Sequence, residues 1–523
     1  MKKFLKEWRW TITAGLGIFL LALGIRIYNL TILPVFVDEA IYIRWAQVMR
    51  AESTLRFLPL SDGKQPLYMW LVIPFLKFIS DPLFAGRIVS VLSGMLTLIG
   101  IFLLSYQLFK SRKVALISSF LYAISPYAVF FDRMALADSL LSMFGIWILL
   151  LGTYTVKKLR LDYAMFTGFA LGGALLTKSP ALFFAILLPS VWILSECKKN
   201  KKIILIHLFK LICFTAVVYI LGYGLYSILR LGPNFQMIGL RNQDYIFPIS
   251  HLWTNFKDPL IPHLKDFLLW IWTMGPSLLF PMMLLGVFFG FKKYFKEILL
   301  LLGWSLFPIL VQSEFAKVFT ARYIFFALPY LFVLSGVVFL TKSKLLSKVA
   351  VLITVVIVFQ ALKFDYLLLT NPEKANLPGG ERSGYLEEWT AGQGIKEVAE
   401  YLRIENAKNP NEQIVVGTEG YFGTLPDGLQ MYLNDVPKIV IIGVGIDIRE
   451  TPQSLIEALK AGNKTYLVIN KSRFKGNADV QGFKLISSFP KPPRRIGSRE
   501  YVIKGSQEVL LFYQLMEAKD ATI

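Results

Sequence analysis

Long apolar stretches are the sequence feature that most constrains the fold of this 523-residue chain. Residues 11–30 (TITAGLGIFLLALGIRIYNL) carry one charge, Arg26, and are long enough to cross a hydrocarbon core about 30 Å thick. No small-residue cleavage pattern follows them, so we interpret this stretch as a retained anchor and not as a signal peptide. The sequence offers eleven candidate spans: 11–30, 86–109, 114–131, 139–155, 163–177, 179–195, 203–227, 265–290, 297–312, 318–340 and 349–367. We therefore predict a polytopic α-helical membrane protein.

The basic residues of the chain, whose formal net charge is +21, are distributed unevenly between the predicted loops. If eleven helices alternate across a membrane, the N-terminal tail and five loops on its side hold twenty Lys and Arg residues. Those loops are 110–113, 157–160, 198–202, 291–296 and 341–348. Positive residues favour the cytoplasmic side, so we predict a multi-pass protein of the cell (plasma) membrane with a cytoplasmic N-terminus. Topology thus explains the positive charge, and nucleic-acid binding is a weak explanation of it.

This topology places four segments on the extracytoplasmic side of the membrane: 31–85, 132–138, 228–264 and everything after about residue 370. In the first of them, 40–49 and 66–79 combine apolar and aromatic residues in a way typical of helices that lie along the membrane interface. After residue 370 the composition becomes that of a soluble domain. We therefore expect a transmembrane domain over 1–369 and an extracytoplasmic domain over 370–523.

The soluble region alternates short apolar strands with amphipathic helices. Strands are predicted at 413–418, 438–444 and 464–470, and helices at 395–402 and 454–461. This alternation indicates a small α/β domain. The GVG stretch at 443–445 lacks a third suitably spaced glycine, so a dinucleotide site is not supported. Two cysteines, Cys197 and Cys213, are too few for a disulfide framework or a Cys-based zinc site.

Two adjacent carboxylates, Asp38 and Glu39, stand at the start of the first predicted external helix. The helix dipole stabilises acidic residues in the first turn, so capping alone would account for both. The alternative is a carboxylate that takes a proton from an attacking hydroxyl group as a general base. The residues by themselves leave both interpretations open.

Other ionisable residues are predicted at the same boundary of the membrane. They are Lys64, Arg87, Asp132, Arg133, Asp138, Lys178 and Arg322. Charges at membrane depth are costly and usually face a cavity or a partner, although any one of them could be a snorkelling anchor. Lys and Arg can neutralise a phosphate, and carboxylates can orient a sugar or activate a hydroxyl group. Such a set suits the transfer of a group from a lipid-linked phosphate to an alcohol, because fixed positive charge stabilises the departing phosphate.

The segments that carry these residues resemble the GT-C class of polyprenyl-phosphate-dependent glycosyltransferases, in the superfamily of protein O-mannosyltransferases and lipid A aminoarabinose transferases. The matching segments are DEAIYIRWAQVM (38–49), DGKQPLYMWL (62–71), LFAGRIVSVLSGMLTLIGIFLLSYQLF (83–109), DRMALADSLL (132–141), LLTKSPALFFAILLP (175–189) and ARYIFFALP (321–329). The resemblance implies a GT-C fold and an inverting transferase that moves a sugar from a polyprenyl-phosphate carrier to an acceptor hydroxyl. The acceptor, whether lipid, protein or glycan, is left open.

By motif position, the resemblance implies that Asp38 is the catalytic carboxylate, that Glu39 is its neighbour, and that Asp138 is the acidic residue of the second external loop. Lys64 matches the lysine before the second interfacial helix, although KQP here replaces the more usual KPP and removes one rigid residue from the loop. The remaining candidates for substrate binding are Arg87, Arg133, Lys178, Arg322 and the adjoining Tyr323.

Cofactors and alternative functions are less constrained. The histidines His207, His251 and His263 lack Cys or carboxylate clusters at ligand spacing, so no metal site can be built from them. Some members of the superfamily hold a metal ion, which keeps a divalent cation as an open alternative. The Gly- and aromatic-rich stretch 417–433 is interpreted as a functional loop that faces the acceptor.

Two other classes of protein fit parts of the sequence. A polytopic transporter or flippase would be expected to show charges near the middle of the membrane and internal repeats, which we do not find. A scaffold that only presents the external domain would leave Asp38 and the distant basic residues without a shared task. The glycosyltransferase is the leading hypothesis.

Overall fold

The computed structural model describes residues 2–196 and 201–516, and the chain divides into two compact units. The first unit comprises 1–30, 54–71 and 87–378. The second unit joins 31–53 and 72–86 to 379–523, so it contains most of the predicted soluble region together with two pieces of the first predicted external loop. The sequence did not predict this combination. Cys197 and most of the predicted basic loop 198–202 lie outside the described residues.

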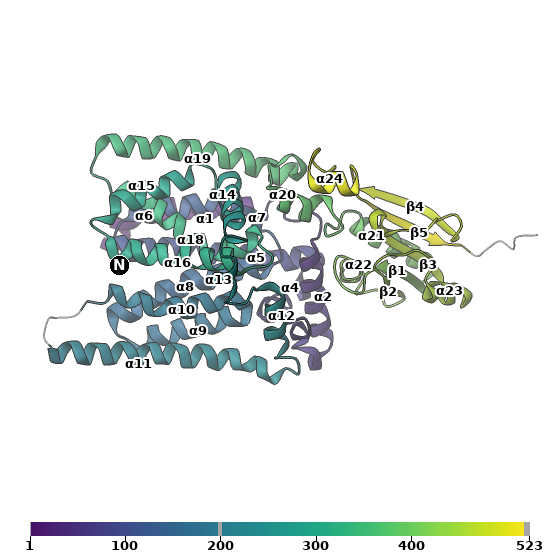
Figure 1. Cartoon of the computed structure of the whole chain (residues 1–523), viewed down its shortest axis with the longest axis horizontal. Helices are drawn as coiled ribbons and strands as arrows, with labels where there is room; N and C mark the ends of the chain where they lie inside the picture. The colour runs from purple at the N-terminus through teal and green to yellow at the C-terminus, as the bar shows by residue number, and fades with distance from the viewer. Residues whose placement is uncertain (1, 197–200, 517–523) are drawn as a thin grey trace, which may run out of the picture. The chain divides into compact units, whose positions relative to one another are not determined.

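The first unit is helical, and its long helices α8, α9 and α11 run side by side (Figure 1). The helices that lie wholly or mainly in this unit are α1 (Lys2–Ile27), α3 (Leu67–Val72), α5 (Pro82–Phe109), α6 (Arg112–Ile124), α7 (Pro126–Phe131), α8 (Ala137–Lys158), α9 (Leu161–Thr177), α10 (Leu182–Leu187), α11 (Lys201–Tyr226), α12 (Met237–Tyr245), α13 (His251–Thr254), α14 (Leu260–Met274), α15 (Leu279–Phe291), α16 (Phe295–Phe315), α17 (Ala321–Ile324), α18 (Pro329–Gly336) and α19 (Lys344–Thr370). Short 3-10 turns join several of them.

Every one of the eleven predicted apolar stretches is helical in the structure. Among the described residues, six helices are long and apolar enough to span a membrane: α1 from Lys6, α5, α8, α11 with the turn that extends it, α16 and α19. Two bent pairs, α14 with α15 (103°) and α17 with the helical segment Pro329–Leu340 (52°), raise the number to eight if each pair is one span. The chain is therefore a multi-pass membrane protein.

The gap between eight spans and the eleven expected has a local cause. Helix α9 and the helical segment Ser179–Leu194 are apolar but short. The predicted stretch 114–131 is broken at Ser125 into α6 and α7. The predicted span 265–290 is counted among the eight, but it is a bent pair, because Gly275 and Pro276 stand where α14 ends and proline cannot continue the backbone ladder.

Contacts place predicted basic loops at one end of the first unit, beside the beginning of α1. The Arg112 guanidinium donates a hydrogen bond to the Glu7 carbonyl at 2.6 Å. The Lys113 ammonium lies 4.9 Å from the centroid of the Phe339 ring, just before the basic loop 341–348. This gathering of basic loops at one end agrees with the predicted alternation of helices across a membrane. Which side of a membrane this end faces stays a prediction.

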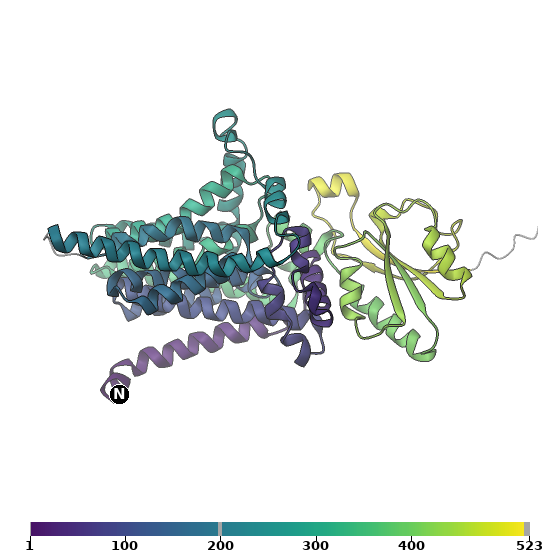
Figure 2. The same cartoon turned by 90° about the horizontal axis from the view of Figure 1, so that it is seen from below.

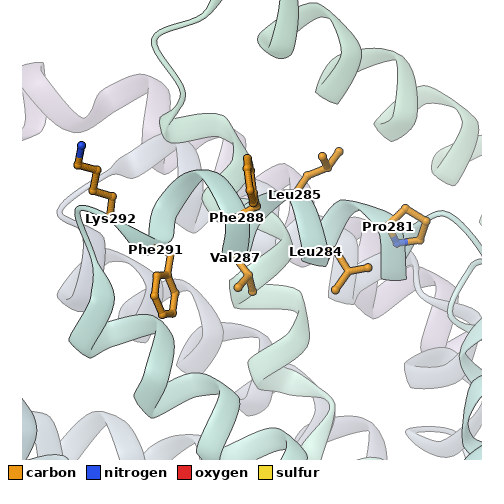
Figure 3. A pocket seen from close by; sticks show the side chains of 7 residues that line it. All are labelled: Pro281, Leu284, Leu285, Val287, Phe288, Phe291 and Lys292. Carbon is orange, nitrogen blue, oxygen red and sulfur yellow. The ribbon is translucent and has the colours of Figure 1, made fainter.

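The surface of α15 suits contact with lipid. Its side chains line an open groove of about 830 Å³, with a single charge, Lys292, at one end (Figure 3). Phe288 is 74% exposed in this apolar setting. Water would solvate such a surface poorly, whereas hydrocarbon chains would cover it without cost.

The second unit contains a five-stranded sheet in the order β2-β1-β3-β5-β4. Its strands are β1 (Ile414–Glu419), β2 (Ile439–Gly445), β3 (Lys464–Asn470), β4 (Phe483–Pro490) and β5 (Val509–Leu515). Strands β2, β1 and β3 are parallel, as the predicted alternation of strands and helices implies, and β5 and β4 add an antiparallel edge. The predicted C-terminal α/β domain is present, although its last two strands were not predicted.

Helices cover both faces of this sheet (Figure 2). Neighbouring residues of a strand point to opposite faces. Leu467 faces the side on which Leu455 of α23 (Gln453–Lys460) completes the core, whereas Tyr466 faces the side on which Tyr401 of α21 (Ile395–Lys408) contacts its ring. The remaining helices of this unit are α2 (Val37–Ala51), α4 (Phe75–Phe78), α20 (Gly379–Arg382), α22 (Asp427–Tyr432) and α24 (Arg499–Lys504).

Helix α2, predicted from residues 40–49, packs on α22 within the second unit. The Gln47 side-chain amide donates to the Met431 carbonyl at 2.9 Å. Arg44 donates to the side chains of Gln430 and Asn434 at 3.2 and 2.6 Å. These hydrogen bonds and the packing on α22 hold α2 against protein of the same unit.

The contact between α15 and α18 depends on a glycine, which gives a first prediction. A Cβ added to Gly286 would collide with the Leu334 carbonyl oxygen. We expect Gly286→Ala to separate the two helices and to lower the free energy of unfolding by about 1–3 kcal/mol. Thermal unfolding in detergent measures this change. Gly303→Ala in α16 is the matched control, because a Cβ there meets nothing within 4 Å, and an equal effect of both variants would contradict the packing argument.

Candidate functional site

An ion pair joins two of the predicted site residues in the first unit. Asp138 lies in the first turn of α8, and Lys178 directly follows the last residue of α9. The Lys178 ammonium donates to Asp138 Oδ1 at 2.6 Å. The carboxylate side chain is 5% exposed and the lysine side chain 22% exposed, so the lysine is the more accessible partner. Because α8 and α9 form a hairpin, the pair lies at the end of the unit opposite the basic loops.

Tyr323 and Arg322 complete this cluster from α17. The Lys178 ammonium lies 4.7 Å from the centroid of the Tyr323 ring, and the Arg322 guanidinium carbon lies 5.2 Å from it. Both contacts are cation–π interactions, which are attractive at these distances. The Tyr127 hydroxyl donates to the Ala321 carbonyl at 2.6 Å and fixes the start of α17. Two cations thus flank one half-buried aromatic ring.

Lys64 lies in a loop that contains a second cluster of ion pairs. Its ammonium lies 3.2 Å from Asp62, and Arg241 of α12 lies 3.6 Å from the same carboxylate. Gly63 adopts φ +66°, a conformation that favours glycine, and this turn carries the chain from Asp62 to Lys64. Sequence reasoning missed Asp62 and Arg241, because nothing local pairs them.

The residue that departs from the family pattern makes a specific contact. The Gln65 side-chain amide donates to the Ser179 hydroxyl at 2.9 Å. Gln65 adjoins Lys64 and Ser179 adjoins Lys178, so this bond brings the two lysine-bearing segments together. A proline at position 65 could not donate it. The hydrogen bond supplies an anchor where a second proline would have stiffened the loop.

Arg133 occupies a different environment from these residues. Its guanidinium donates to four backbone carbonyls at the C-terminal end of α1, those of Ile25, Arg26, Tyr28 and Asn29, at 2.7–3.1 Å. The side chain is 1% exposed. Carbonyls at the end of a helix lack intrahelical donors and attract positive charge, so Arg133 acts here as a helix cap. Its predicted role in substrate binding is not supported by an accessible surface.

Two further arginines near this end are also fully buried. Arg26, the lone charge of the first apolar stretch, pairs with Asp132 at 2.9 Å, and the Tyr122 hydroxyl donates to the same carboxylate oxygen at 2.8 Å. Arg87 donates to the Leu30 carbonyl at 2.9 Å. A partner for Arg26 could be expected from the sequence, because a charge within a membrane helix requires one.

Asp38 and Glu39 belong to the second unit, where they occupy the first turn of α2. Glu39 is fully buried, and its carboxylate accepts a hydrogen bond from the Phe36 backbone N–H at 3.0 Å. Glu39 therefore caps the helix. Asp38 is half-buried beside it. The two interpretations left open by the sequence thus separate, since one carboxylate performs the capping and the other remains the candidate base.

Aromatic residues of the second unit have defined neighbours. Phe422, in the predicted functional loop, stacks on Trp45 of α2 with ring centroids 6.4 Å apart, and Tyr421 is 73% exposed. The Arg473 guanidinium covers one face of the Trp389 ring at 3.9 Å. The role of this loop toward an acceptor stays a prediction.

The described residues do not fit a metal centre. Within 2–196 and 201–516, no group of three or more His, Cys, Asp and Glu side chains is placed to hold an ion. His251 faces a single carboxylate, that of Glu314, at 3.3 Å. We derive no step through a metal.

The chain is a multi-pass membrane protein with a fold of the GT-C type. Residues 63–220 match the family model of dolichyl-phosphate-mannose-protein mannosyltransferases. This match includes Lys64, Asp138 and Lys178, but it includes neither Asp38 nor Arg322. The resemblance and the fold class predicted from the sequence are confirmed.

Similarity to solved structures extends over the whole chain. The crystal structure of ArnT from Cupriavidus metallidurans in the apo state is 14% identical, with a TM-score of 0.57 and coverage of 97% of this chain and 98% of that chain. The same protein bound to undecaprenyl phosphate is 15% identical, with a TM-score of 0.54 and coverage of 98% and 99%. At this level of identity the likeness concerns the fold. No curated protein sequence matches the chain.

The four carbonyl contacts of Arg133 lead to a second prediction. Arg133→Met should lower the free energy of unfolding by roughly 2–4 kcal/mol, because buried carbonyls lose their donors. Arg230→Met, at an exposed side chain, should change it by less than about 0.5 kcal/mol. Thermal unfolding followed by tryptophan fluorescence compares the two. If Arg133→Met has normal stability but fails to bind a lipid-phosphate donor, the result would contradict the capping role and indicate that Arg133 binds substrate.

Proposed function

We propose that the protein is a membrane glycosyltransferase that moves a sugar from a polyprenyl-phosphate carrier to an acceptor hydroxyl. The single observation that carries this proposal is the cluster of Lys178, Asp138, Tyr323 and Arg322 at one end of the helical unit. Two cations and one carboxylate give this cluster net positive charge at the end of apolar helices. A lipid-linked phosphate presents the complementary combination of a hydrocarbon chain and an anion.

The anion partner in this proposal is the carrier phosphate. Arg322 can bind a phosphate through two N–H groups, and Lys178 can approach it as a point charge. The Tyr323 ring between them adds an apolar face on which a sugar or an isoprenoid unit can rest. The similar fold of ArnT is known with undecaprenyl phosphate bound, which supports a polyprenyl phosphate as the ligand class.

The proposed reaction is a single displacement. Asp38 accepts the proton of the acceptor hydroxyl as its oxygen attacks the anomeric carbon. The bond from that carbon to the phosphate oxygen breaks, and the carrier leaves as the phosphate with the bonding electrons. Fixed cations stabilise the charge that develops on it. Attack from the face opposite the leaving group inverts the anomeric centre.

The proposal assigns this chemistry to the extracytoplasmic face. The cluster lies at the end of the first unit opposite the basic loops, and basic loops favour the cytoplasm. No ATP is available outside the cell, so the activated carrier supplies the driving force. The remaining predicted substrate-binding residue of this region, Lys64, would add a further positive charge through the loop that Gln65 anchors.

A direct assay tests this function. Purified protein is incubated with a panel of undecaprenyl-phosphate-linked sugars, and release of the free carrier phosphate is measured with and without extracts of envelope lipid, protein and glycan. We expect release that depends on one acceptor fraction. Movement of the intact donor across vesicle membranes without release would favour a flippase.

The third prediction concerns Asp38. Asp38→Asn should abolish transfer, at least about 100-fold in kcat, because the amide cannot accept the proton, while expression and thermal stability stay near wild type. Asp162→Asn is the control, since that exposed carboxylate pairs with Arg160 at the far end of the α8–α9 hairpin. Wild-type turnover by Asp38→Asn would defeat its assignment as the base.

The fourth prediction separates donor binding from acceptor binding. Lys178→Ala and Arg322→Ala should each raise the KM for the lipid-linked donor by roughly 10–100-fold, the loss expected for one charge-assisted contact, with a much smaller effect on the acceptor KM. Lys348→Ala, at an exposed position, is the control. Equal losses toward both substrates would indicate that these cations only support the structure.

A further inference from the structure

The chain just before Asp38 is held by a short antiparallel contact inside the second unit. The Val37 N–H donates to the Thr390 carbonyl at 3.0 Å, and the Gly392 N–H donates to the Val35 carbonyl at 2.8 Å. Three backbone groups just before Asp38 are thereby fixed: the Val35 carbonyl, the Val37 N–H and the Phe36 N–H, which donates to the Glu39 carboxylate. This contact fixes the backbone that leads into Asp38.

The two segments approach closely. Phe36 and Ala391 form the bridge pair between the two hydrogen bonds. A Cβ on Gly392 would lie 2.7 Å from the Val35 carbonyl oxygen, so the backbones could not come as near with another residue there. The segment 388–392 therefore acts as a template for residues 35–37.

One buried lysine holds this template. The Lys491 ammonium donates to the Glu388 carbonyl at 2.9 Å and to the Ala391 carbonyl at 2.7 Å. Lys491 is 1% exposed and follows directly after β4, so the bond ties the template to the sheet. Buried carbonyls without donors are costly, which makes this contact a strong constraint on the segment.

Charges around the lysine secure the same segment a second time. The Glu388 carboxylate receives Arg494 at 2.7 Å and Lys504 at 2.9 Å, and Arg494 also reaches Glu508 at 3.4 Å. Burial, together with the positive charge of Arg473, lowers the pKa of Lys491 to about 8. The facing carboxylates Glu419, Glu508 and Glu388 act in the opposite direction and raise the pKa. A neutral amine retains two N–H groups, so both carbonyl contacts persist on either side of that pKa.

We propose that Lys491 is a positioning residue that directs the carboxylate of Asp38. It fixes residues 388–391, which fix residues 35–37, which set the first turn of α2. The inference rests on the proposed function, because it requires Asp38 to be the base. It also gives the sheet of the second unit a task in catalysis, because Lys491 directly follows β4.

The fifth prediction tests this chain of contacts by kinetics. In the full-length protein, Lys491→Met should lower kcat by roughly 10–100-fold and leave the KM for the undecaprenyl-phosphate-linked sugar within twofold, because a misplaced base slows the chemical step. Lys484→Met, on the exposed part of β4, should keep the wild-type kcat. A wild-type kcat for Lys491→Met overturns the proposal.

A rescue experiment distinguishes positioning from general support of the fold. Bridge pairs of the type that Phe36 and Ala391 form have Cα atoms about 4.5 Å apart, within the range of a disulfide. In a background carrying Cys197→Ser and Cys213→Ser, the oxidised Phe36→Cys/Ala391→Cys pair should restore most of the kcat that Lys491→Met removes. Dithiothreitol should abolish the rescue. Failure of the oxidised pair to restore activity would leave Lys491 a merely structural residue and sink the inference.

A readout without catalysis keeps the two proposals separate. Hydrogen exchange of the peptide that contains Val35–Val37 should become faster in Lys491→Met and stay unchanged in Lys484→Met. If Asp38→Asn is active, the assignment of the base fails even though this exchange result can still hold. If Asp38→Asn is inactive and Lys491→Met exchanges like wild type, only the positioning role fails.

Discussion

The ion pair between Arg26 and Asp132 is the interaction on which one end of the helical unit depends. Hydrocarbon cannot solvate a guanidinium, so the only charge in the first apolar stretch must find its partner inside the protein. Both side chains are fully buried, and breaking such a pair costs about 3–5 kcal/mol. The pair fixes the end of α1 against the turn that follows α7. That turn leads directly into α8, whose first turn carries Asp138.

Arginines at this end divide into two kinds by what surrounds them. Arg133 has its donors directed at backbone carbonyls and is closed to solvent, which makes it part of the framework. Arg322 is half-buried and lies over an aromatic ring beside a lysine. The second kind of side chain is partly open to solvent, whereas the first is closed to it. The sequence could not distinguish these two arginines, because both are arginines predicted at the same boundary of the membrane.

The sequence predicted the features that depend on how each segment interacts with water or lipid and on the spacing of its apolar residues. Apolar length predicted the helices, charge asymmetry predicted that basic loops gather at one end, and alternation predicted β1, β2 and β3. Pairings between distant residues were not predictable, because Lys178 with Asp138 and Gln65 with Ser179 depend on how helices pack. Strand β4 was missed because it carries several polar residues at the edge of the sheet, where one face needs little apolar character. Strand β5 is mostly apolar and lies between β3 and β4, so its sequence did carry a strand signal, and the expected alternation of strands and helices did not include it.

The same reasoning explains the two carboxylates at the start of α2. Sequence alone gave Asp38 and Glu39 equal claims to capping and to catalysis, since both lie in the first turn. Geometry separates them, because only the third residue of a helix reaches back to the N–H before it. A one-residue difference in position thus decides which of the two carboxylates accepts the Phe36 N–H.

The discontinuous second unit has a consequence for how the protein is made. Gln47 and Met431, which hydrogen-bond between α2 and α22, are separated by 384 positions along the chain. At typical translation rates of about 5–20 residues per second, the ribosome needs roughly 20–80 seconds to produce the second partner after the first. During that interval α2 lacks α22, the helix on which it packs. The second unit cannot be completed until the C-terminal part of the chain has been made, so its assembly is a late step in the biogenesis of the protein.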